Sequence, residues 1–322
     1  MIRKIAGFGM TAVMLYIGYF YITHSPFPDS KARDAIGTKV VIQSESRITN
    51  GITYYVSGPD APAKRVVLSA SAGREASDFN ALVTALNAAG YRTLAVEHGG
   101  INGAPLIAAP DMELLAFPLI TALEHDRYMD DGEPFAFIGH AFGNRVVRAA
   151  GDHFERLTGE AKPSAVILLA AGGPAAIDPD TDAALKQIFD PRLPFKTRKA
   201  AMTSAFFAPG NTIPDHWTRG WHRETAMLQG KAKTNKIEQW EDAGGVPMLA
   251  VQPAQDRIAP RADAADYLAA KFPDQVTVAT IEGAGHALLP EQPEAVADAV
   301  IAYLDRVTAA PKTPETQAPK NE

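Results

Sequence analysis

Residues 139–144 read Gly139-His140-Ala141-Phe142-Gly143-Asn144, and they decide the fold of this 322-residue chain. They follow the apolar run Phe135–Ile138, which is typical of a buried strand, and precede a helical stretch from Arg145 to Phe154. A sharp strand-to-helix turn needs glycine on both sides, because strand and helix come close and the central residue takes a strained conformation. The segment therefore predicts such a turn, with Ala141 at its centre.

The pattern Gly-x-Ser-x-Gly at such a turn is the nucleophile elbow, and here Gly139 and Gly143 match it with alanine in place of serine. The match is weak by itself, because glycine-rich turns between a strand and a helix are common. Taken alone, the segment fits an ordinary tight turn equally well.

Two further segments follow in the chain order that a nucleophile elbow requires, first an acid and then a histidine. Asp256 lies on the loop after the apolar run 247–251, and His286 lies on the loop after the apolar run 276–281. Open α/β sheets bind their ligands on loops of this kind, at the carboxyl ends of neighbouring strands. The order and placement predict a catalytic dyad of Asp256 and His286 rather than an isolated turn aspartate and an isolated histidine.

The rest of the chain favours a mostly parallel sheet. Asn50-Gly51 between alternating apolar flanks predicts a tight hairpin, so that two antiparallel strands begin the sheet. Short apolar runs separated by helix-length segments then predict six parallel strands. These strands are expected at 66–68, 93–96, 135–138, 165–169, 248–251 and 276–281, with helices such as 79–89 and 296–307 between or after them.

With these motifs the chain resembles the α/β-hydrolase superfamily, in the branch of capped esterases, lyases and related enzymes. The resemblance covers about residues 45–306 and implies an α/β-hydrolase fold: a mostly parallel eight-stranded sheet flanked by helices. A helical cap is expected at about 174–240, where no strand-like run occurs. Aromatic and apolar residues of this segment predict an apolar lid, namely Phe206, Phe207, Trp217, Trp221 and Met227.

The chain departs from the family pattern at two places. The first is Ala141, and the second is the segment 70–74, where the family usually has His-Gly and this chain has Ala-Ser-Ala-Gly-Arg. The resemblance implies an oxyanion hole built from the backbone amides of Phe142 and Ala72, which do not depend on side-chain identity. Ser69 and Ser71 are candidate substitute nucleophiles, although a serine that ends a strand is more often a turn residue.

Alanine at the nucleophile position leaves three hypotheses. Removing the serine of a serine hydrolase costs about 10⁶-fold in rate, so ordinary esterase turnover is not expected. Either His286, oriented by Asp256, acts as a general base on water or substrate, or the protein only binds a ligand, or a serine was replaced by alanine to trap a substrate. The dyad favours the first hypothesis, because a buried aspartate and imidazole are costly to keep in a site that only binds. A small or medium substrate or ligand with a carbonyl group is expected.

Composition excludes several partners and cofactors. The net charge of −6 comes from acidic and basic residues mixed along the chain, so nucleic acid is not expected to bind. The chain has no cysteine, which excludes a thiol nucleophile, a disulfide and a zinc–thiolate site. No dinucleotide fingerprint, phosphate loop or metal-ligand spacing of histidines occurs, so neither cofactor nor metal is expected. Protein partners cannot be inferred from the sequence.

Residues 1–25 are interpreted as a membrane anchor or signal segment. Arg3 and Lys4 precede Ile5–Ile22, which is a run of eighteen residues without a charge. This length and the preceding charges predict an anchor with the domain on the non-cytoplasmic side, periplasmic or extracellular. Secretion after signal cleavage and a buried core helix are the alternatives. We expect a linker at 26–37, one α/β-hydrolase domain at 38–308 and a disordered tail at 309–322.

Overall fold

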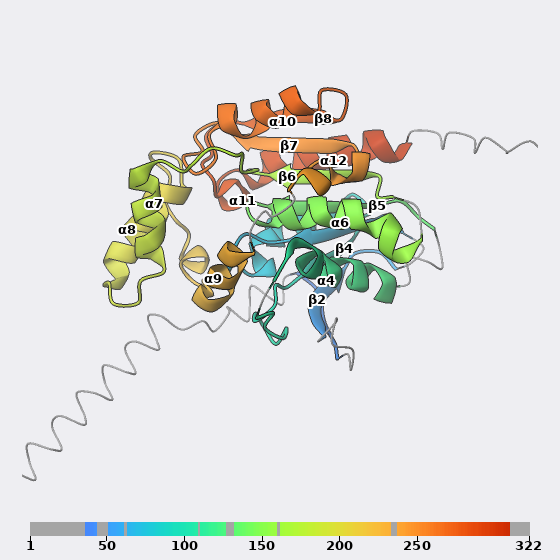
Figure 1. Cartoon of the computed structure of the whole chain (residues 1–322), viewed down its shortest axis with the longest axis horizontal. Coiled ribbons are helices and arrows are strands. Elements are labelled where there is room, and N and C mark those ends of the chain that lie inside the picture. The colour runs from blue at the N-terminus through green and yellow to red at the C-terminus, as the bar shows by residue number, and fades with distance from the viewer. Residues whose placement is uncertain are drawn as a thin grey trace, which may run out of the picture.

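The protein is described from a computed structural model, which covers residues 36–43, 51–60, 63–108, 110–126, 132–159, 162–232 and 237–309. These residues form one eight-stranded sheet with the strand order β1-β2-β4-β3-β5-β6-β7-β8 (Figure 1). The strands are β1 Thr38–Ile42, β2 Ile52–Ser57, β3 Arg65–Ser69, β4 Arg92–Val96, β5 Phe135–His140, β6 Ala165–Leu169, β7 Met248–Pro253 and β8 Val276–Ile281.

Strand β2 pairs antiparallel with both β1 and β4, and all the other neighbours pair in parallel. The predicted fold, two antiparallel strands followed by six parallel ones, is confirmed. The predicted hairpin is present, because β1 and β2 are consecutive antiparallel strands, and with Ile42 paired to Ile52 its connection spans residues 43–51. Of that connection, residues 44–50 lie outside the described part of the chain.

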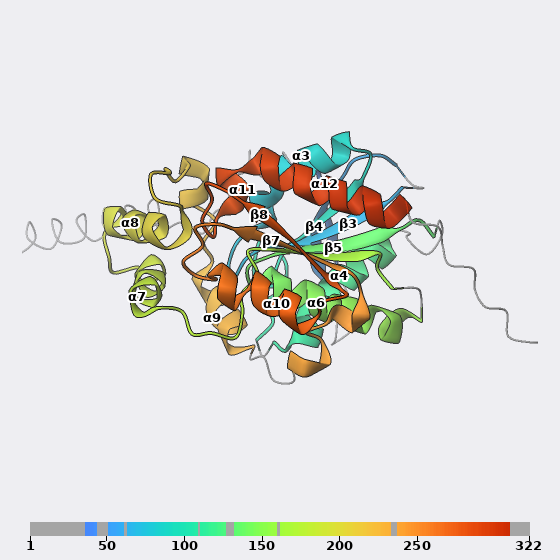
Figure 2. The same cartoon turned by 90° about the horizontal axis from the view of Figure 1, so that it is seen from above.

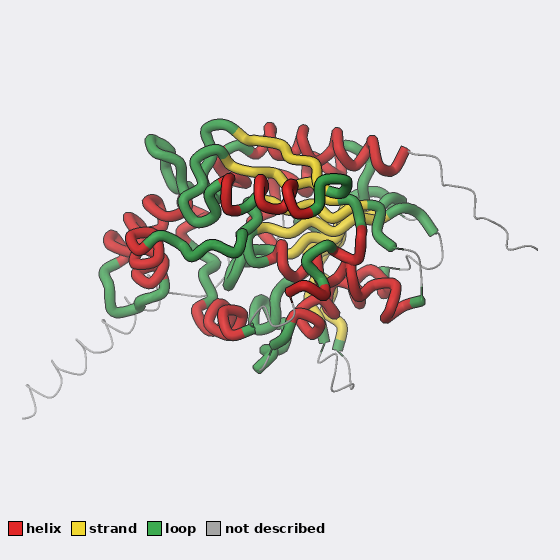
Figure 3. The backbone as a smooth tube through the Cα atoms, turned by 45° about the horizontal axis from the view of Figure 1, so that its top comes forward, coloured by secondary structure: helices red, strands yellow, loops and turns green. Residues whose placement is uncertain are grey.

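Helices cover both faces of the sheet (Figure 2). One face carries α3 (Asn80–Ala88), α11 (Leu288–Glu291) and α12 (Pro293–Ala309), and the other carries α4 (Met112–His125), α6 (Gly143–Thr158) and α10 (Ala265–Lys271). The strands lie as a twisted middle layer between them (Figure 3). Because both faces are covered, β3, β5 and β6 are buried along their whole length, which explains why they read as continuous apolar runs.

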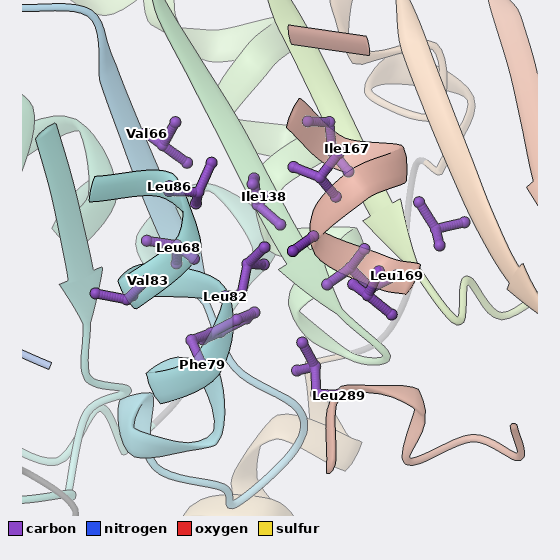
Figure 4. Close-up of a cluster of buried hydrophobic side chains, with 14 of the residues drawn as sticks. Val66, Leu68, Phe79, Leu82, Val83, Leu86, Ile138, Ile167, Leu169 and Leu289 are labelled. Carbon is purple, nitrogen blue, oxygen red and sulfur yellow. The ribbon is translucent and has the colours of Figure 1, made fainter. Parts of the chain in front are cut away.

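The packing on the α3 side shows how the pattern of apolar residues selects this arrangement. Leu82, Val83 and Leu86 of α3 belong to one buried apolar cluster with side chains of β3, β5 and β6 (Figure 4). Helix α12 adds Val296, Val300 and Leu304, which recur every four residues and therefore lie on one face. Burying such apolar side chains contributes about 1.5–3 kcal/mol each.

A helical cap lies between β6 and β7 at one end of the sheet (Figure 1). Its helices are α7 (Pro179–Ile188), α8 (Phe195–Phe206) and α9 (Arg223–Lys231), joined by short 3-10 turns that include η2 (Asp215–Thr218). Phe206, Phe207 and Trp217 are buried in the cap's own apolar core. Met227, also predicted for the apolar lid, lies in α9 of the cap but is 46% exposed rather than buried.

The predicted membrane segment lies outside the described residues. Residues 1–35 and 310–322 are not described, so the predictions of an anchor, of most of the linker and of a tail stay predictions. Among the helices that the structure describes, none has the length and apolar character needed to cross a membrane.

The turn after β5 depends on two close backbone contacts. A Cβ at Gly143 would lie 2.1 Å from the carbonyl oxygen of Ser69, and a Cβ at Gly139 would lie 2.5 Å from the carbonyl group of Gly143. Between them, Ala141 has a φ of +50°, which L-residues rarely adopt. The predicted sharp turn is therefore present, and its glycines permit β5, β3 and α6 to approach each other.

Replacing Gly143 with alanine is expected to lower the free energy of unfolding by about 3 kcal/mol, since the new methyl group meets the rigid backbone of β3. Urea unfolding followed by circular dichroism measures this change. Gly230→Ala in α9 is the matched control, because no atom lies within 4 Å of the added methyl group. It should change the free energy of unfolding by no more than about 1 kcal/mol, in the stabilising direction. Equal losses in the two variants would contradict the importance of the close approach.

Candidate active site

Asp256 and His286 lie together at the carboxyl ends of β7 and β8. The imidazole Nδ1 of His286 is 2.8 Å from Asp256 Oδ2, and the two residues are only 4% and 6% exposed respectively. An ionised carboxylate can only accept hydrogen bonds, so Nδ1 carries the proton in this pair. In the neutral ring Nε2 is then left with its lone pair, and it has no hydrogen-bond partner among the described residues.

Two backbone amides hold the carboxylate in this position. Asp256 Oδ1 accepts from the N–H of Ile258 at 2.9 Å and from the N–H of Ala259 at 2.8 Å. One carboxylate oxygen is thus used by the loop and the other by His286. The aspartate therefore fixes the loop after β7 and orients the imidazole at the same time.

His140, the residue before Ala141, supports the backbone of His286. Its Nε2 donates to the carbonyl oxygen of His286 at 2.8 Å, and its ring centroid lies 5.6 Å from that of His286. Burial, and next the neighbouring imidazole of His286, lower the pKa of His140 to about 4. His140 is therefore a neutral donor at neutral pH, and it holds the backbone of His286 in place.

The loop that carries His286 is also held by Glu291. One oxygen of this carboxylate accepts from the N–H of Gly285 at 2.7 Å, and the other accepts from the N–H of Ala208 and the side chain of Asn211, both at 2.7 Å. Burial raises the pKa of the Glu291 carboxyl, while these donors favour its charged form. Because Ala208 and Asn211 follow α8, this carboxylate ties the histidine loop to the cap.

A cavity of about 330 Å³ lies between the sheet and the cap, with His286 in its wall. Ala141, Phe142 and Ala72 also line it, so the structure brings together all the side chains and amides predicted for the site. Neither the N–H of Phe142 nor that of Ala72 donates a hydrogen bond to any described residue. An oxyanion hole needs two such unpaired amides in the wall of the cavity that holds the substrate. Apolar cap side chains, including Phe206, Trp221 and Leu185, form much of the remaining wall.

The loop that presents Ala72 is fixed from the cap. The N–H of Gly73 donates to Gln229 Oε1 at 2.8 Å, and the carbonyl of Gly73 accepts from the N–H of His222 at 2.8 Å. Next to it, Arg74 forms an ion pair with Asp78 and lies against two cap indoles, those of Trp217 and Trp221. Cation–π contacts with the guanidinium 4.4 Å and 4.5 Å from the ring centres add to this docking.

Neither candidate substitute nucleophile is hydrogen-bonded to Asp256 or His286 within the described residues. The hydroxyl of Ser69 is buried without a hydrogen-bond partner, and Ser69 does not line the cavity. Ser71 does line the cavity, but no hydrogen bond joins it to His286 within the described residues. A serine is a weak nucleophile until a base takes its proton, so this arrangement does not activate either hydroxyl.

Sequence motifs do not identify several residues that shape the site. Glu291, Arg74 and Gln229 act through contacts between distant segments, which no single segment reveals. Arg145 also lines the cavity. Its position three residues after Phe142 on a helix, hence on the same face, is the signal that predicts this. In the described part of the chain, no three histidine or acidic side chains gather to hold a metal ion.

The chain belongs to the alpha/beta hydrolase family, whose profile matches residues 66–299. Among curated protein sequences, none matches the chain. Solved structures share the fold at low sequence identity.

A thermophilic esterase from Thermogutta terrifontis, with malate bound, is 15% identical with a TM-score of 0.63, over 84% of this chain and all of that one. An esterase from Exiguobacterium antarcticum is 17% identical with a TM-score of 0.63, over 83% of this chain and all of that one. A membrane phospholipase A, described as a bacterial virulence factor, is 14% identical with a TM-score of 0.64, over 96% of this chain and all of that one.

His140 is expected to make stability fall with acid. Its pKa is lower in the folded protein than the ordinary 6.5, so between about pH 6.5 and pH 4 the unfolded chain binds more protons and stability declines as pH falls. Urea unfolding at pH 7 and at pH 4.5 measures the decline. His140→Gln, which keeps an N–H donor but does not titrate, should reduce the difference between the two pH values by up to about 3 kcal/mol.

The control for this experiment is His216→Gln, which removes an exposed histidine of the cap. His216→Gln should leave the difference in the free energy of unfolding between pH 7 and pH 4.5 the same as in the unmodified protein. Comparing each variant with the unmodified protein cancels the other titrating groups, including Glu97, whose pKa burial raises to about 7. An identical decline in His140→Gln and the unmodified protein would show that His140 is not the neutral donor described above.

Proposed function

We propose that this α/β hydrolase acts on a small or medium ester-type or other carbonyl substrate, with His286 as general base and without a serine nucleophile. The observation that carries the proposal is the 2.8 Å hydrogen bond from His286 Nδ1 to Asp256, made at the wall of a cavity between sheet and cap. Two solved esterases share the fold, which supports a carbonyl substrate by analogy.

In the proposed hydrolysis, a water molecule takes the place of the missing hydroxyl near Ala141. His286 Nε2 accepts a proton from this water as its oxygen forms a bond to the carbonyl carbon. The amides of Phe142 and Ala72 stabilise the negative charge that develops on the carbonyl oxygen. The ester bond then breaks, and the imidazolium returns the proton to the leaving oxygen. Asp256 stabilises the imidazolium between the two transfers.

A ligand-binding protein without catalysis is the second candidate function. The observation that favours it is the alanine at the elbow, together with the absence of a hydrogen bond between His286 and any hydroxyl group of the described residues. The cavity is largely apolar and can hold a ligand without any chemistry. The two candidates differ in one respect: only the first needs the imidazole to accept a proton.

Ala141→Ser tests the proposal. Because the turn is set by Gly139 and Gly143, a serine should fit without rearrangement and meet His286 and the free amide of Phe142. We expect hydrolysis of short-chain p-nitrophenyl esters to rise at least about 100-fold over the unmodified protein, a fraction of the roughly 10⁶-fold that a serine nucleophile can supply.

His286→Ala added to Ala141→Ser should abolish the gain, and Ser71→Ala added to Ala141→Ser should not. A variant that keeps its circular dichroism spectrum but gains no activity would count against a preserved catalytic site and for the ligand-binding candidate. Strong activity in the unmodified protein that Ser71→Ala removes would instead identify Ser71 as the nucleophile.

We also propose that residues 5–22 anchor the protein in a membrane with the hydrolase domain on the non-cytoplasmic side. The support is the uncharged run of eighteen residues after Arg3 and Lys4. A shared fold with a membrane phospholipase A is compatible with this location and does not establish it.

Fractionation of cells that express the full chain tests the location. The full chain should sediment with membranes, resist extraction by high salt and be degraded by protease added from the non-cytoplasmic side. A variant without residues 1–24 should stay in the soluble cytoplasmic fraction. If both forms distribute identically between the fractions, the anchor assignment is wrong.

A further inference from the structure

One positively charged side chain in the wall of the cavity has no partner among the described residues. Arg145 lies in the first turn of α6 and lines the cavity with Ala141, Phe142 and His286. Its guanidinium forms no ion pair or hydrogen bond with any of the described residues. Burial lowers the pKa of Arg145, which is the effect of partial desolvation without a compensating acid.

The other arginines that are buried or half-buried in the described part of the chain each have at least one hydrogen-bond or ion-pair partner. Arg65 and Arg92 share Asp126, each at 2.8 Å, and Arg74 forms its ion pair with Asp78. Arg148, one turn after Arg145, donates to a backbone carbonyl at 3.2 Å and lies 5.3 Å from the ring centre of Trp240. Arg198, which is also half-buried, has no ion pair but donates to the carbonyl oxygen of Ile188 at 2.8 Å. Among the described arginines that are at least half-buried, Arg145 is therefore the exception.

Charges near Arg145 do not replace a partner. Arg148 is a neighbour of like charge, and its own pKa is lowered first by burial and, less strongly, by Arg145. Asp263 lines the same cavity, but it is exposed at the rim and forms no ion pair with Arg145. His286 is already hydrogen-bonded to Asp256. The wall of the cavity near the elbow therefore has one uncompensated positive charge.

We propose that Arg145 binds a carboxylate of the substrate, so that the substrate class is a carbonyl or ester compound with an apolar body and one negative charge. The guanidinium fork matches a carboxylate with two parallel hydrogen bonds, which suits a single arginine without a nearby lysine. Arg145 and Phe142 are three residues apart, so they are neighbours on one face of the helix. A carboxylate bound to Arg145 therefore lies near the proposed oxyanion hole. This inference deepens the proposed function, and it rests on the same cavity.

Calorimetry with two ligands of equal shape tests the inference without requiring turnover. The probes are monobenzyl glutarate and its primary amide, which replaces the carboxylate by an uncharged group of similar size. The unmodified protein should bind the acid at least about tenfold more tightly than the amide, since hydrogen bonds between charged groups are about twice as strong as neutral ones.

Arg145→Met should weaken binding of the acid about 10- to 100-fold and leave binding of the amide within about twofold. Retained binding of the amide shows that the cavity is still folded. Arg145→Lys should keep part of the preference, because it restores the charge without the fork. Arg192→Met, which removes an exposed arginine of the cap outside this cavity, is the matched control and should change neither affinity.

Equal affinities for acid and amide in the unmodified protein would overturn the inference, and so would a preference that survives Arg145→Met. These binding results are independent of whether the proposed hydrolysis takes place. If Ala141→Ser gains no activity, the catalytic proposal is wrong, but the preference for the acid over the amide can still hold. If Ala141→Ser gains full activity but the unmodified protein does not prefer the acid over the amide, only the role of Arg145 is wrong.

Discussion

The close approach of the turn after β5 to the end of β3 is the constraint on which the rest of the site depends. A Cβ at Gly143 would clash with the carbonyl oxygen of Ser69. Glycine at this position therefore lets the N-terminus of α6 pack closely against the end of β3, next to the cavity. Phe142, whose backbone amide is free of hydrogen bonds to the described residues, and Ala141 both lie in the wall of the cavity. From the same strand edge, His140 reaches across to the backbone of His286. One tight backbone contact thus aligns the amide, the nucleophile position and the histidine loop.

The cap does more than cover the cavity, because it holds both loops that carry the functional groups. On one side Gln229 and His222 bond the backbone of Gly73, next to the amide of Ala72. On the other side the backbone of Phe206 accepts from the N–H of Ala287, and its ring lies 5.5 Å from the ring of His286. A rigid-body opening of the cap would break these bonds. Cap position and site geometry are therefore coupled, and a change in one alters the other.

The sheet could be predicted from the sequence because buried parallel strands read as continuous apolar runs. Residues 165–169, for example, are all buried. The hydrogen bond between Asp256 and His286 could also be predicted, because both residues follow the carboxyl ends of adjacent strands. Asn50-Gly51 predicted the hairpin but not the length of its connection, since strand register is a long-range property. Met227 could not be placed either, because helix amphipathicity does not say which face meets the cavity. The ties through Glu291 and Arg74 join segments far apart in the chain, and no local pattern encodes them.

The strained backbone at Ala141 separates the geometry of the site from the identity of its central side chain. An alanine with φ of +50° costs on the order of 1–3 kcal/mol, which glycine would largely avoid. The conformation persists because its neighbours impose it. The N–H of Ala141 donates to the carbonyl of Leu169 at 3.0 Å, and its carbonyl accepts from the N–H of Asn144 at 3.1 Å. Neither bond involves the side chain, so the lack of a hydroxyl does not require the turn to relax. The amides and the imidazole keep their places, and the chemistry open to them is set by the molecule that the cavity admits beside His286.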